Sequence, residues 1–444
     1  MGRGGQRVAE TKSSAATKPA GAEKLAPEDE WIGSLDLSGF RDEIRALGKE
    51  LEAGQGPADA AHLRKLMMWT DICGIVGLFS LWATPNPITV LAMSTWIYTR
   101  WTMFGHHICH GGYDKLSSKG LVSSRFNRFV FAAGSLFRRY TEWFDWFLPE
   151  AWSIEHNQRH HYCLGETEDP DLVEHNLASI RDGTQARWIK LATVSALTVA
   201  WKWYYYAPNT YKELKLSALR RAGKAPPAAC DPSKPCVLEH FLYYPADKML
   251  FTFAEFFGRV MGPYIVGHFM MLPAFAAAMM YAIGESGVMA APMEPRQAAW
   301  NAFINLVFAE LATNFHAFVT IATNHCGDDL YRFGPGCRFA SGTFYLRQVI
   351  SSVDYAAGND LCDYLHGFLN YQIEHHLWPN LSMLSYQRAH PRVQLICAKY
   401  GVPFIKQSCF KRTAKTIQLM VGDISMRKYP LEYECQDDLS TNSE

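Results

Sequence analysis

Residues 66–110, LMMWTDICGIVGLFSLWATPNPITVLAMSTWIYTRWTMFGHHICH, contain two apolar segments separated by a short turn rich in proline. The segments, 66–83 and 88–104, are each just long enough to cross the hydrocarbon core of a bilayer. So short a turn favours an antiparallel pair of helices. The sequence therefore predicts a transmembrane hairpin whose second helix leads directly into His106 and His110. A buried hairpin of a soluble protein is the alternative.

A second hairpin is predicted later in the chain, from the longer apolar segments 260–283 and 302–322. The segment 188–206 is also apolar, but Lys190 and Lys202 interrupt it, so we expect it to lie along the membrane surface. The expected class is thus an all-α polytopic membrane protein with two hairpins, four spans and a helical cap. If 188–206 also spanned, the histidine motifs described below would be divided between the two sides.

The distribution of basic residues orients these hairpins. The two turns that join paired spans, 84–87 and 284–299, contain Arg296 as their only Lys or Arg. Basic flanks stay on the cytosolic side of a membrane. We therefore expect a cytosolic cap, most simply at the endoplasmic reticulum, with a plastid membrane as the alternative. The basic residues that flank the spans on the cap side are Arg64, Lys65, Lys115, Lys119, Arg259 and Arg332.

The composition excludes several classes of protein. The 444 residues carry no formal net charge, which gives no support to a nucleic-acid partner. The 11 cysteines form no C-x-x-C pair, so neither a disulfide framework nor a zinc ribbon is indicated. We expect four parts along the chain: a disordered tail at 1–30, an amphipathic helical segment at 31–62, a membrane domain at 63–405 and a C-terminal tail at 406–444.

Besides His107, eight of the 16 histidines lie in four short motifs outside the predicted spans, and two of these motifs directly follow a span. Neutral imidazole is a good ligand for iron, zinc or copper, and a glutamine oxygen adds a weaker contact. Eight nitrogens and one amide oxygen exceed the needs of one ion, so we predict two metal ions. The predicted ligands are His106, His110, His156, His160, His161, His325, Gln372, His375 and His376.

Other polar residues near the motifs are weaker candidates. His107 lies off the helical face shared by His106 and His110, so we expect it to support a ligand or to be spare. Four acids are candidates to orient the imidazoles, although each also fits a solvated or structural carboxylate. These acids are Glu166, Asp169, Asp171 and Glu374. The histidines not expected to bind metal are His62, His175, His240, His366 and His390.

These motifs resemble the three histidine boxes of the integral-membrane fatty-acid desaturase family. H-x-x-x-H matches at His106 and His110, H-x-x-x-H-H at 156–161, and Q-x-x-H-H at 372–376. LNYQIEHHLWP and the downstream YQRAHPRVQLICAKYGVPF are most similar to the front-end acyl desaturase branch. The resemblance covers roughly residues 65–405. The spacing of the second box and Trp378, where Phe is more usual, depart from the common pattern and leave the attacked acyl position open.

The resemblance implies a membrane enzyme with a diiron centre, two ions that cycle between Fe2+ and Fe3+, on the cytosolic side. Such an enzyme uses O2 to remove hydrogen from two adjacent carbons of a lipid acyl chain. No H-P-G-G haem motif of a fused cytochrome b5 domain occurs, so the resemblance implies a separate electron donor, cytochrome b5 or ferredoxin. We expect no catalytic residue apart from the metal ligands.

Two other functions remain open. A diiron hydroxylase or desaturase of a sphingolipid or sterol would use the same kind of site. A histidine-rich metal transporter is less favoured, because transporters place ionisable residues near the midplane of several spans. The histidine motifs here lie outside the predicted spans.

Overall fold

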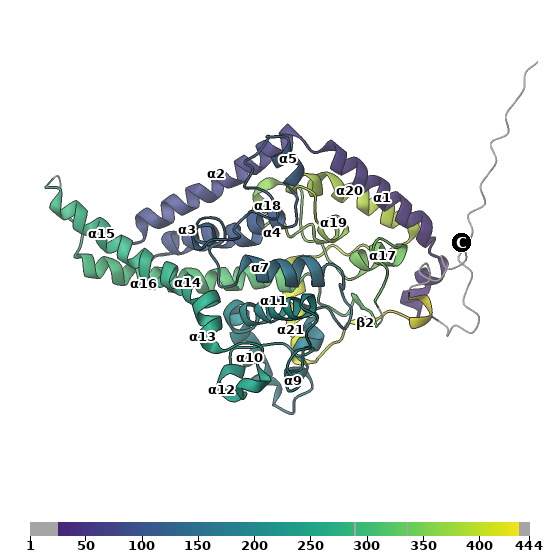
Figure 1. Ribbon diagram of the computed structural model, residues 1–444. Coiled ribbons are helices and arrows are strands. Elements are labelled where there is room, and N and C mark those ends of the chain that lie inside the picture. Colours follow the sequence, from purple (N-terminus) through teal and green to yellow (C-terminus); the bar gives the residue numbers. More distant parts are fainter. Residues whose placement is uncertain (1–24, 288–289, 335, 435–444) are drawn as a thin grey trace, which may run out of the picture.

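The computed structural model describes residues 25–287, 290–334 and 336–434, and these are mostly helical (Figure 1). Most of the tail expected at 1–30 falls outside the described residues. The sheet formed by the described residues has two short parallel strands, β1 (Tyr331–Arg332) and β2 (Arg427–Lys428). The observed class agrees with the all-α expectation.

Two helical hairpins run side by side away from the rest of the molecule (Figure 1). Among the described residues, two helices are long and apolar enough to cross a membrane, Phe253–Glu285 and Pro295–Ala322. Both belong to the second predicted hairpin, so the crossing of the first hairpin stays a prediction. The four helices that project are α2 (Pro57–Ser80), α3 (Pro87–Tyr98), α15 (Leu272–Glu285) and α16 (Pro295–Ala317).

A buried amide ties the two hairpins together at their far end. Asn305 of α16 donates to the main-chain oxygens of Leu81 and Ala83, at 3.2 and 3.0 Å. Asn86 then caps α3 by accepting a hydrogen bond from the Thr89 N–H at 3.0 Å. Polar side chains between helices satisfy main-chain groups that lipid cannot, so Asn305 fixes the turn of the first hairpin against the second.

The predicted amphipathic helix is α1 (Leu37–Gly54), and its apolar face is buried as the spacing of Ile44, Leu47 and Leu51 predicted. Asp36 caps it by accepting from the Gly39 N–H at 2.9 Å. The helix packs against α17 (Gly342–Ile350) and α20 (Met383–Tyr400) (Figure 1).

The packed part of the chain continues past residue 405, where the sequence placed the end of the membrane domain. In α21 (Cys409–Val421), Leu419 and Met420 are buried. Lys406 forms a parallel bridge with Asp354, and β2 pairs with β1. Residues 406–434 thus pack with the rest of the described chain, because Leu419 and Met420 of α21 belong to buried apolar clusters.

The segment expected along the membrane surface forms α10 (Arg187–Trp201) and the π-helix η5 (Lys202–Tyr206). At its aromatic end Tyr206 is buried, whereas Trp203, Tyr204 and Tyr205 are half-buried. Lys202 is fully buried as well, and its ammonium pairs with Asp145 at 2.8 Å. The two lysines therefore differ in role, because Lys202 anchors η5 to the protein through Asp145, and the placement of this segment along the membrane surface stays a prediction.

The remaining helices connect and surround the elements described above. They are η1 (Pro27–Ser34), η2 (Thr99–Gly105), α4 (His106–Cys109), α5 (Asp114–Ser118), α6 (Leu136–Arg138), η3 (Arg139–Trp143), α7 (Pro149–Trp152), η4 (Ser153–His160), α8 (Val173–Asn176), α9 (Ala178–Arg181), α11 (Ala207–Arg221), α12 (His240–Tyr243), η6 (Ala246–Lys248), α13 (Phe253–Phe256), η7 (Phe257–Met261), α14 (Gly262–Val266), η8 (Gly267–Met271), η9 (Phe318–Ala322), α18 (Asp360–Leu365), α19 (Gln372–Leu377) and η10 (Leu431–Tyr433).

Candidate metal centre

The four histidine motifs, which are far apart in the sequence, converge on one buried place. The eight predicted histidines form two groups, and within each group one ring nitrogen per residue lies within 4.8 Å of the others. The spacing therefore selected residues that the fold does bring together. The larger group contains His106, His110, His156, His161 and His375, and the smaller contains His160, His325 and His376.

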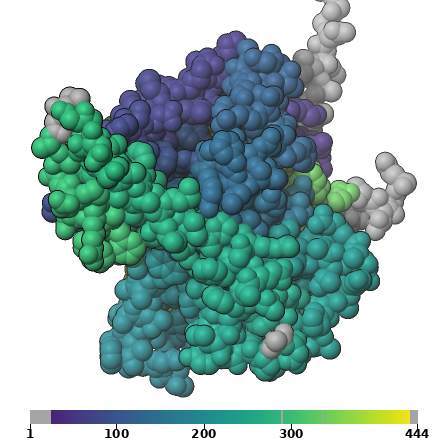
Figure 2. All heavy atoms as spheres, turned by 60° about the vertical axis from the view of Figure 1, so that its left-hand side comes forward, coloured from purple at the N-terminus to yellow at the C-terminus, as the bar shows by residue number. Residues whose placement is uncertain are grey.

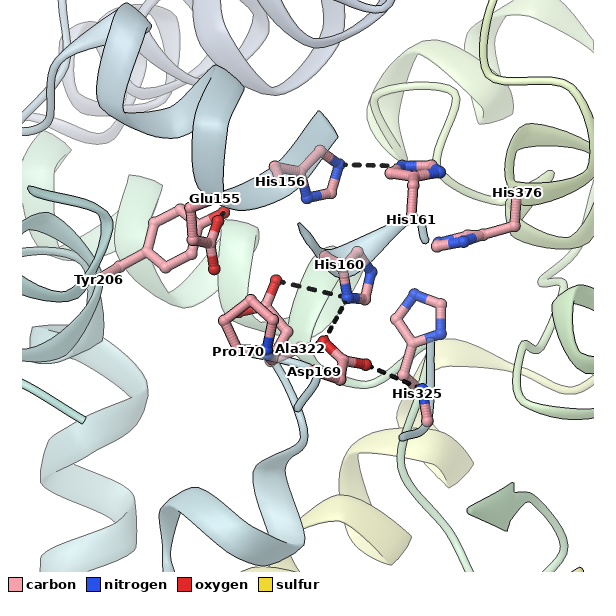
Figure 3. A network of polar contacts seen from close by, with 12 residues as sticks. Glu155, His156, His160, His161, Asp169, Pro170, Tyr206, Ala322, His325 and His376 are labelled. Atoms are coloured by element: carbon pink, nitrogen blue, oxygen red, sulfur yellow. Dashed lines mark hydrogen bonds and ion pairs between the residues drawn. The ribbon is translucent and has the colours of Figure 1, made fainter. Parts of the chain in front are cut away.

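Ring nitrogens of the larger group face one another directly. Nε2 of His106 lies 2.9 Å from Nε2 of His375 and 3.2 Å from Nε2 of His156. Nε2 of His161 lies 3.3 Å from Nε2 of His156 (Figure 3). Several imidazoles that turn the same nitrogen toward one point form the donor set that a divalent transition metal prefers.

The smaller group includes the predicted amide ligand. Nε2 of Gln372 lies 3.0 Å from Nε2 of His325. The ring of His376 lies 4.7 Å from that of His325 and 5.0 Å from that of His160, between centroids. Figure 3 shows His160, His325 and His376 around one space. The amide oxygen of Gln372 needs only a rotation of the terminal amide to reach the side of His325.

A π-helix explains why three residues of the second motif point inward. In η4 the hydrogen bonds run from residue i+5 to i, and the His161 N–H reaches the His156 oxygen at 3.2 Å. The wider turn places residues four and five apart on the same side. His160 and His161 can therefore both lie beside His156. The spacing predicted these three histidines, but it did not predict the π-helix that turns all three toward the same side.

Hydrogen bonds fix the protonated ring nitrogen of two histidines in the smaller group. Nδ1 of His160 donates to Asp169 at 2.9 Å (Figure 3). Nδ1 of His325 donates to the Ser351 carbonyl at 3.0 Å. A neutral imidazole carries one proton, so the Nε2 lone pair of each ring is left for a metal.

The third motif is oriented in the same way. Nδ1 of His376 donates to the Gln348 amide oxygen at 3.2 Å. Nδ1 of His375 donates to the Tyr386 hydroxyl at 3.3 Å, because that hydroxyl uses its own proton on the Trp378 carbonyl at 3.1 Å. Histidine spacing did not point to Gln348 or Tyr386, since neither lies in a histidine motif, although Tyr386 begins the stretch YQRAHPRVQLICAKYGVPF.

Several buried polar atoms of the site have no hydrogen-bond partner among the described residues. Nε2 of His110, Nε2 of His376 and Oε1 of Gln372 are in this state. Buried polar atoms rarely stay without a partner in folded proteins, because the loss of hydration is not offset. These atoms lie on the predicted ligands, so the donor set fits bound metal.

Two of the four candidate orienting acids lie beside a motif histidine, and two do not. Asp169 bonds His160, and Asp171 lies 3.8 Å from the same ring nitrogen. Glu166 instead pairs with Arg347 at 2.6 Å, and Glu374 bonds His390 at 3.2 Å. Glu166 and Glu374 therefore fit the alternative of a structural carboxylate, because each has a closer partner elsewhere.

His107 and His390, which the sequence did not predict as ligands, both have hydrogen-bond partners outside the two histidine groups. Nδ1 of His107 donates to the Met103 carbonyl at 2.6 Å, and His107 belongs to neither group. His390 was not expected to bind metal, yet it lies in a further buried group with Asp354 and Glu374. Hydrogen bonds and ion pairs within that group engage His390 Nδ1, which lies 2.9 Å from Asp354.

Burial sets the charge state of the site. Burial, followed by the neighbouring imidazoles of His156 and His107, lowers the pKa of His106 well below its ordinary value. Burial, followed by His160, lowers the pKa of His325 to about 3. Burial opposes a charge on His160 as well, but Asp169 outweighs it and raises the pKa of His160. Most of these rings are therefore neutral near pH 7, as metal ligands must be.

The histidine groups open onto a cavity of about 400 Å³. Five predicted ligands line it, and apolar or aromatic side chains form most of its other walls. These ligands are His106, His156, His160, His325 and Gln372. A cavity of this kind suits a long apolar molecule held against the histidines. The walls come from α9, α10, η5, η9 and α21, and include Ile180, Leu197, Trp201, Phe318, Ile321 and Met420.

Comparison with curated proteins found desaturases. The chain is 27% identical over 121 residues to an acyl-lipid (9-3)-desaturase of Physcomitrium patens, covering 27% of this chain and 22% of that protein. It is 26% identical over 121 residues to Delta(8)-fatty-acid desaturase 1 of Arabidopsis thaliana, covering 27% and 26%. It is 32% identical over 103 residues to an NADPH-dependent stearoyl-CoA 9-desaturase of Mycobacterium tuberculosis, covering 23% and 24%. The chain thus spans about a quarter of the length of these relatives.

No solved structure matched the chain. The model of the family described as "Fatty acid desaturase" matches residues 80–408, which include every predicted ligand. Fatty acid desaturases use iron, and the buried histidine groups offer the nitrogen donors that iron accepts. Because the family match covers most of the chain, this protein belongs to the fatty acid desaturase family.

Proposed function

We propose that this protein is an O2-dependent desaturase that introduces a double bond into a lipid acyl chain. The observation that carries this proposal is the cavity of about 400 Å³, which is lined by motif histidines and mostly by apolar or aromatic side chains elsewhere. The relatives act on acyl chains by name, and two of them act at the positions called (9-3) and Delta(8). With the third box headed by Gln372, these names favour the front-end branch.

We assign the nine predicted side chains as the ligands of two iron ions, one ion for each histidine group. The donors fit, because each group offers neutral imidazole nitrogens and the atoms without partners lie on these residues. Iron bound there supplies the O2 chemistry and the oxidising power needed to remove hydrogen from an unactivated carbon.

The other residues of the site orient the histidine rings, hold the acyl chain and keep water out of the cavity. Asp169, Ser351, Tyr386 and Gln348 fix the ring orientation of their histidines, which keeps the reacting site rigid. The apolar walls keep water away and hold the acyl chain in register. A misplacement of about 1 Å can lower the rate on the order of a hundredfold, so the walls determine which carbons react.

We place the active site on the cytosolic side of a membrane crossed four times, most simply that of the endoplasmic reticulum. The support is the scarcity of Lys and Arg in the two far turns. We also infer a separate electron donor, cytochrome b5 or ferredoxin, as in the expectation from the sequence.

Lipid profiling of a host that expresses the protein tests this function. We expect a new unsaturated acyl chain with the wild type and none with His161→Ala, while both proteins insert in membranes at equal levels. His175→Ala is the matched control, because His175 lies outside both groups. A hydroxylated product in place of the double bond, or an unchanged profile with iron-loaded protein and a donor present, would overturn the proposal.

A further inference from the structure

A further buried group of side chains lies beside the third histidine box. It consists of Asp354, Glu374 and His390, whose possible donor atoms lie within 4.8 Å of one another. Nδ1 of His390 lies 2.9 Å from a carboxylate oxygen of Asp354 and 3.2 Å from one of Glu374. All three side chains are buried. None of them is among the nine assigned ligands, so the group needs a separate explanation.

The geometry around His390 does not suit a third metal ion. Because two carboxylates lie beside Nδ1, that nitrogen carries a proton and donates it to them, which leaves no lone pair there for a metal. The other ring nitrogen, Nε2, lies 3.1 Å from Nζ of Lys406 and 3.2 Å from the amide nitrogen of Gln394. The Lys406 ammonium also repels a further cation nearby. The group is therefore a network of hydrogen bonds and ion pairs.

Asp354 also holds the first turn of the third box. Its second oxygen, Oδ1, accepts the main-chain N–H of Ile373 at 2.9 Å. Such an N–H at the start of a helix has no partner within the helix itself. Tyr371, which directly precedes α19, donates its hydroxyl to Asp363 at 2.8 Å instead of accepting from the helix. Asp354, from another part of the chain, therefore fixes where the third box begins.

The segment around Asp354 also holds the fourth histidine motif. The carbonyl of Ser351 accepts from Nδ1 of His325 at 3.0 Å. The N–H of Val353 donates to the carbonyl of Asn324, the residue before His325, also at 3.0 Å. The same short segment therefore bonds both the loop of the fourth motif and the helix of the third box.

His390 of α20 joins this segment to the third box. Its Nδ1–H faces Asp354 of the segment and Glu374 of the box at once, so one donor bridges the two elements. The main chain of Asp354 is held from the other side, because its N–H donates to Ile405 at 3.0 Å and its carbonyl accepts from Gln407 at 2.9 Å. The segment is therefore fixed, and His390 carries that fixed position over to the box.

Burial makes the loss of this bridge costly. On the face shown in Figure 2, segments coloured blue, teal and green, which precede the third box in the sequence, make up most of the surface. Asp354 and Glu374 are both fully buried. Buried charges are weakly screened, and removal of one partner leaves the others uncompensated. Without His390 the two carboxylates are expected to move apart, and the third box is expected to move with Glu374.

We propose that His390 is a positioning residue of the metal centre, which sets the place of the smaller histidine group by bonding Asp354 and Glu374 together. This inference rests on the two metal ions assigned above. His390 touches neither a ligand position nor the acyl cavity, and acts through its two carboxylate partners.

The two histidine groups depend on His390 to different degrees. The larger group takes one of its five members, His375, from the third box. The smaller group takes His376 from that box and His325 from the loop that Ser351 holds, which leaves His160 as its independent member. A shift of α19 against the segment around Asp354 therefore weakens the metal of the smaller group first.

Metal binding without turnover tests the inference. Metal-free, full-length protein in detergent is titrated with Co2+, whose absorption reports the geometry of its ligands. His390→Leu removes the donor, and we expect it to weaken one of two sites about 10 to 100-fold and to leave the other unchanged. His390→Asn places an amide N–H close to the position of Nδ1 and should restore most of the affinity. His175→Leu, exposed and outside both groups, is the matched control and should bind like the wild type.

The Co2+ spectrum separates positioning from a general loss of stability. Positioning predicts that His390→Leu changes the absorption of the more weakly bound Co2+ alone. If His390→Leu does not fold, Asp354→Asn replaces it, because its amide oxygen still accepts from Ile373 while its amide nitrogen cannot accept from His390. Equal weakening of both sites, no weakening of either, or a third bound metal that His390→Leu removes, overturns the inference.

Failure of the positioning role and failure of the proposed metal centre give different results. Wild-type protein that binds two Co2+ ions, with both sites indifferent to His390→Leu, would remove the positioning role and keep the metal centre. Wild-type protein that binds fewer than two ions would overturn the assignment of two metals, and the inference with it.

Discussion

At the residue scale, the site depends on which nitrogen of each ring carries its proton. His160, His325 and His376 each donate from Nδ1 to an oxygen that accepts, so Nε2 faces the metal position. The histidines themselves were predicted from spacing. Their acceptors were mostly missed, because Gln348 and Ser351 lie on and just after α17, with no local pattern that refers to the boxes.

The first prediction concerns Gln348. Gln348→Leu removes the acceptor of His376 Nδ1 and should weaken iron binding about 10 to 100-fold, the usual effect of losing an orienting partner. Gln348→Glu keeps an oxygen at the same place and should retain most of the iron. Iron titration of the purified variants measures this. Equal retention of iron in both variants would show that Gln348 does not orient His376.

The second prediction concerns Gln372. Imidazole can still reach the metal position beside His325, so Gln372→His should keep iron and some product. Gln372→Leu has no lone pair, and we expect little or no product from it. Iron content and lipid profile are measured together. Full activity of Gln372→Leu with normal iron would show that the residue neither binds nor orients.

At the element scale, helix α1 supports the third histidine box through a close contact. A Cβ on Gly48 would lie 2.2 Å from Nε1 of Trp378, whereas a Cβ on Gly54 meets nothing within 4 Å. The Trp378 carbonyl accepts from Tyr386, which in turn accepts from His375. The amphipathic pattern predicted α1, but it did not predict that Gly48 packs against Trp378, which lies far away in the sequence.

The third prediction follows from that contact. Gly48→Ala should destabilise the protein by about 1–3 kcal/mol through overpacking and should lower iron content, because a shift of Trp378 disturbs Tyr386. Gly54→Ala, on the same helix, should be neutral or stabilise by up to about 1 kcal/mol. Thermal unfolding with iron analysis measures both. Matching melting temperatures and iron for the two variants would contradict the role of the contact.

The elements also show where periodicity stops being informative. The apolar run 188–206 contains two lysines that look alike in sequence, yet Lys202 is buried against Asp145. Ion pairing across 57 residues leaves no local signature. The π-helix η4 is similar, because the turn that aligns His156, His160 and His161 is set by packing around them.

At the scale of the whole molecule, the scarcity of Lys and Arg in the two far turns predicts which loops lie on each side of the membrane. Cysteines introduced one at a time at Thr84, Ala290 and Lys224, with accessible native cysteines replaced, report the two sides of the membrane. All three positions are exposed. We expect lumenal labelling at 84 and 290 and cytosolic labelling at 224. Labelling of 224 from the lumen would mean that α10 spans and that the proposed topology is wrong.

The fifth prediction concerns acid. Burial first, and then neighbouring charges, lower the pKa of His325 to about 3, and burial lowers that of His107 to about 4. The folded chain thus binds fewer protons than the unfolded chain below the ordinary histidine pKa of about 6.5. These groups contribute stability above pH 6.5 that is lost as pH falls toward 3, by up to about 1.4 kcal/mol per pH unit for each ring.

His390 acts in the opposite direction. Burial opposes its charge, but the hydrogen bonds to Asp354 and Glu374 raise the pKa of His390 to about 9. Its contribution is complete below the ordinary histidine pKa of about 6.5 and is lost as pH rises from there through 9. Denaturant unfolding of metal-free protein between pH 7 and pH 5 should therefore show a steep loss on acidification. A flat profile over that range would mean that the clustered rings are not held neutral.

We propose above all that the two histidine groups hold two irons that serve an acyl desaturation. The most direct measurement is the metal content of purified, active protein, with product formed per chain under O2 and a reduced electron donor. We predict close to two irons per chain, loss of both iron and product in His161→Ala, and a double bond in the acyl product. Stoichiometric zinc in active protein, or full activity with one iron per chain, would contradict the account.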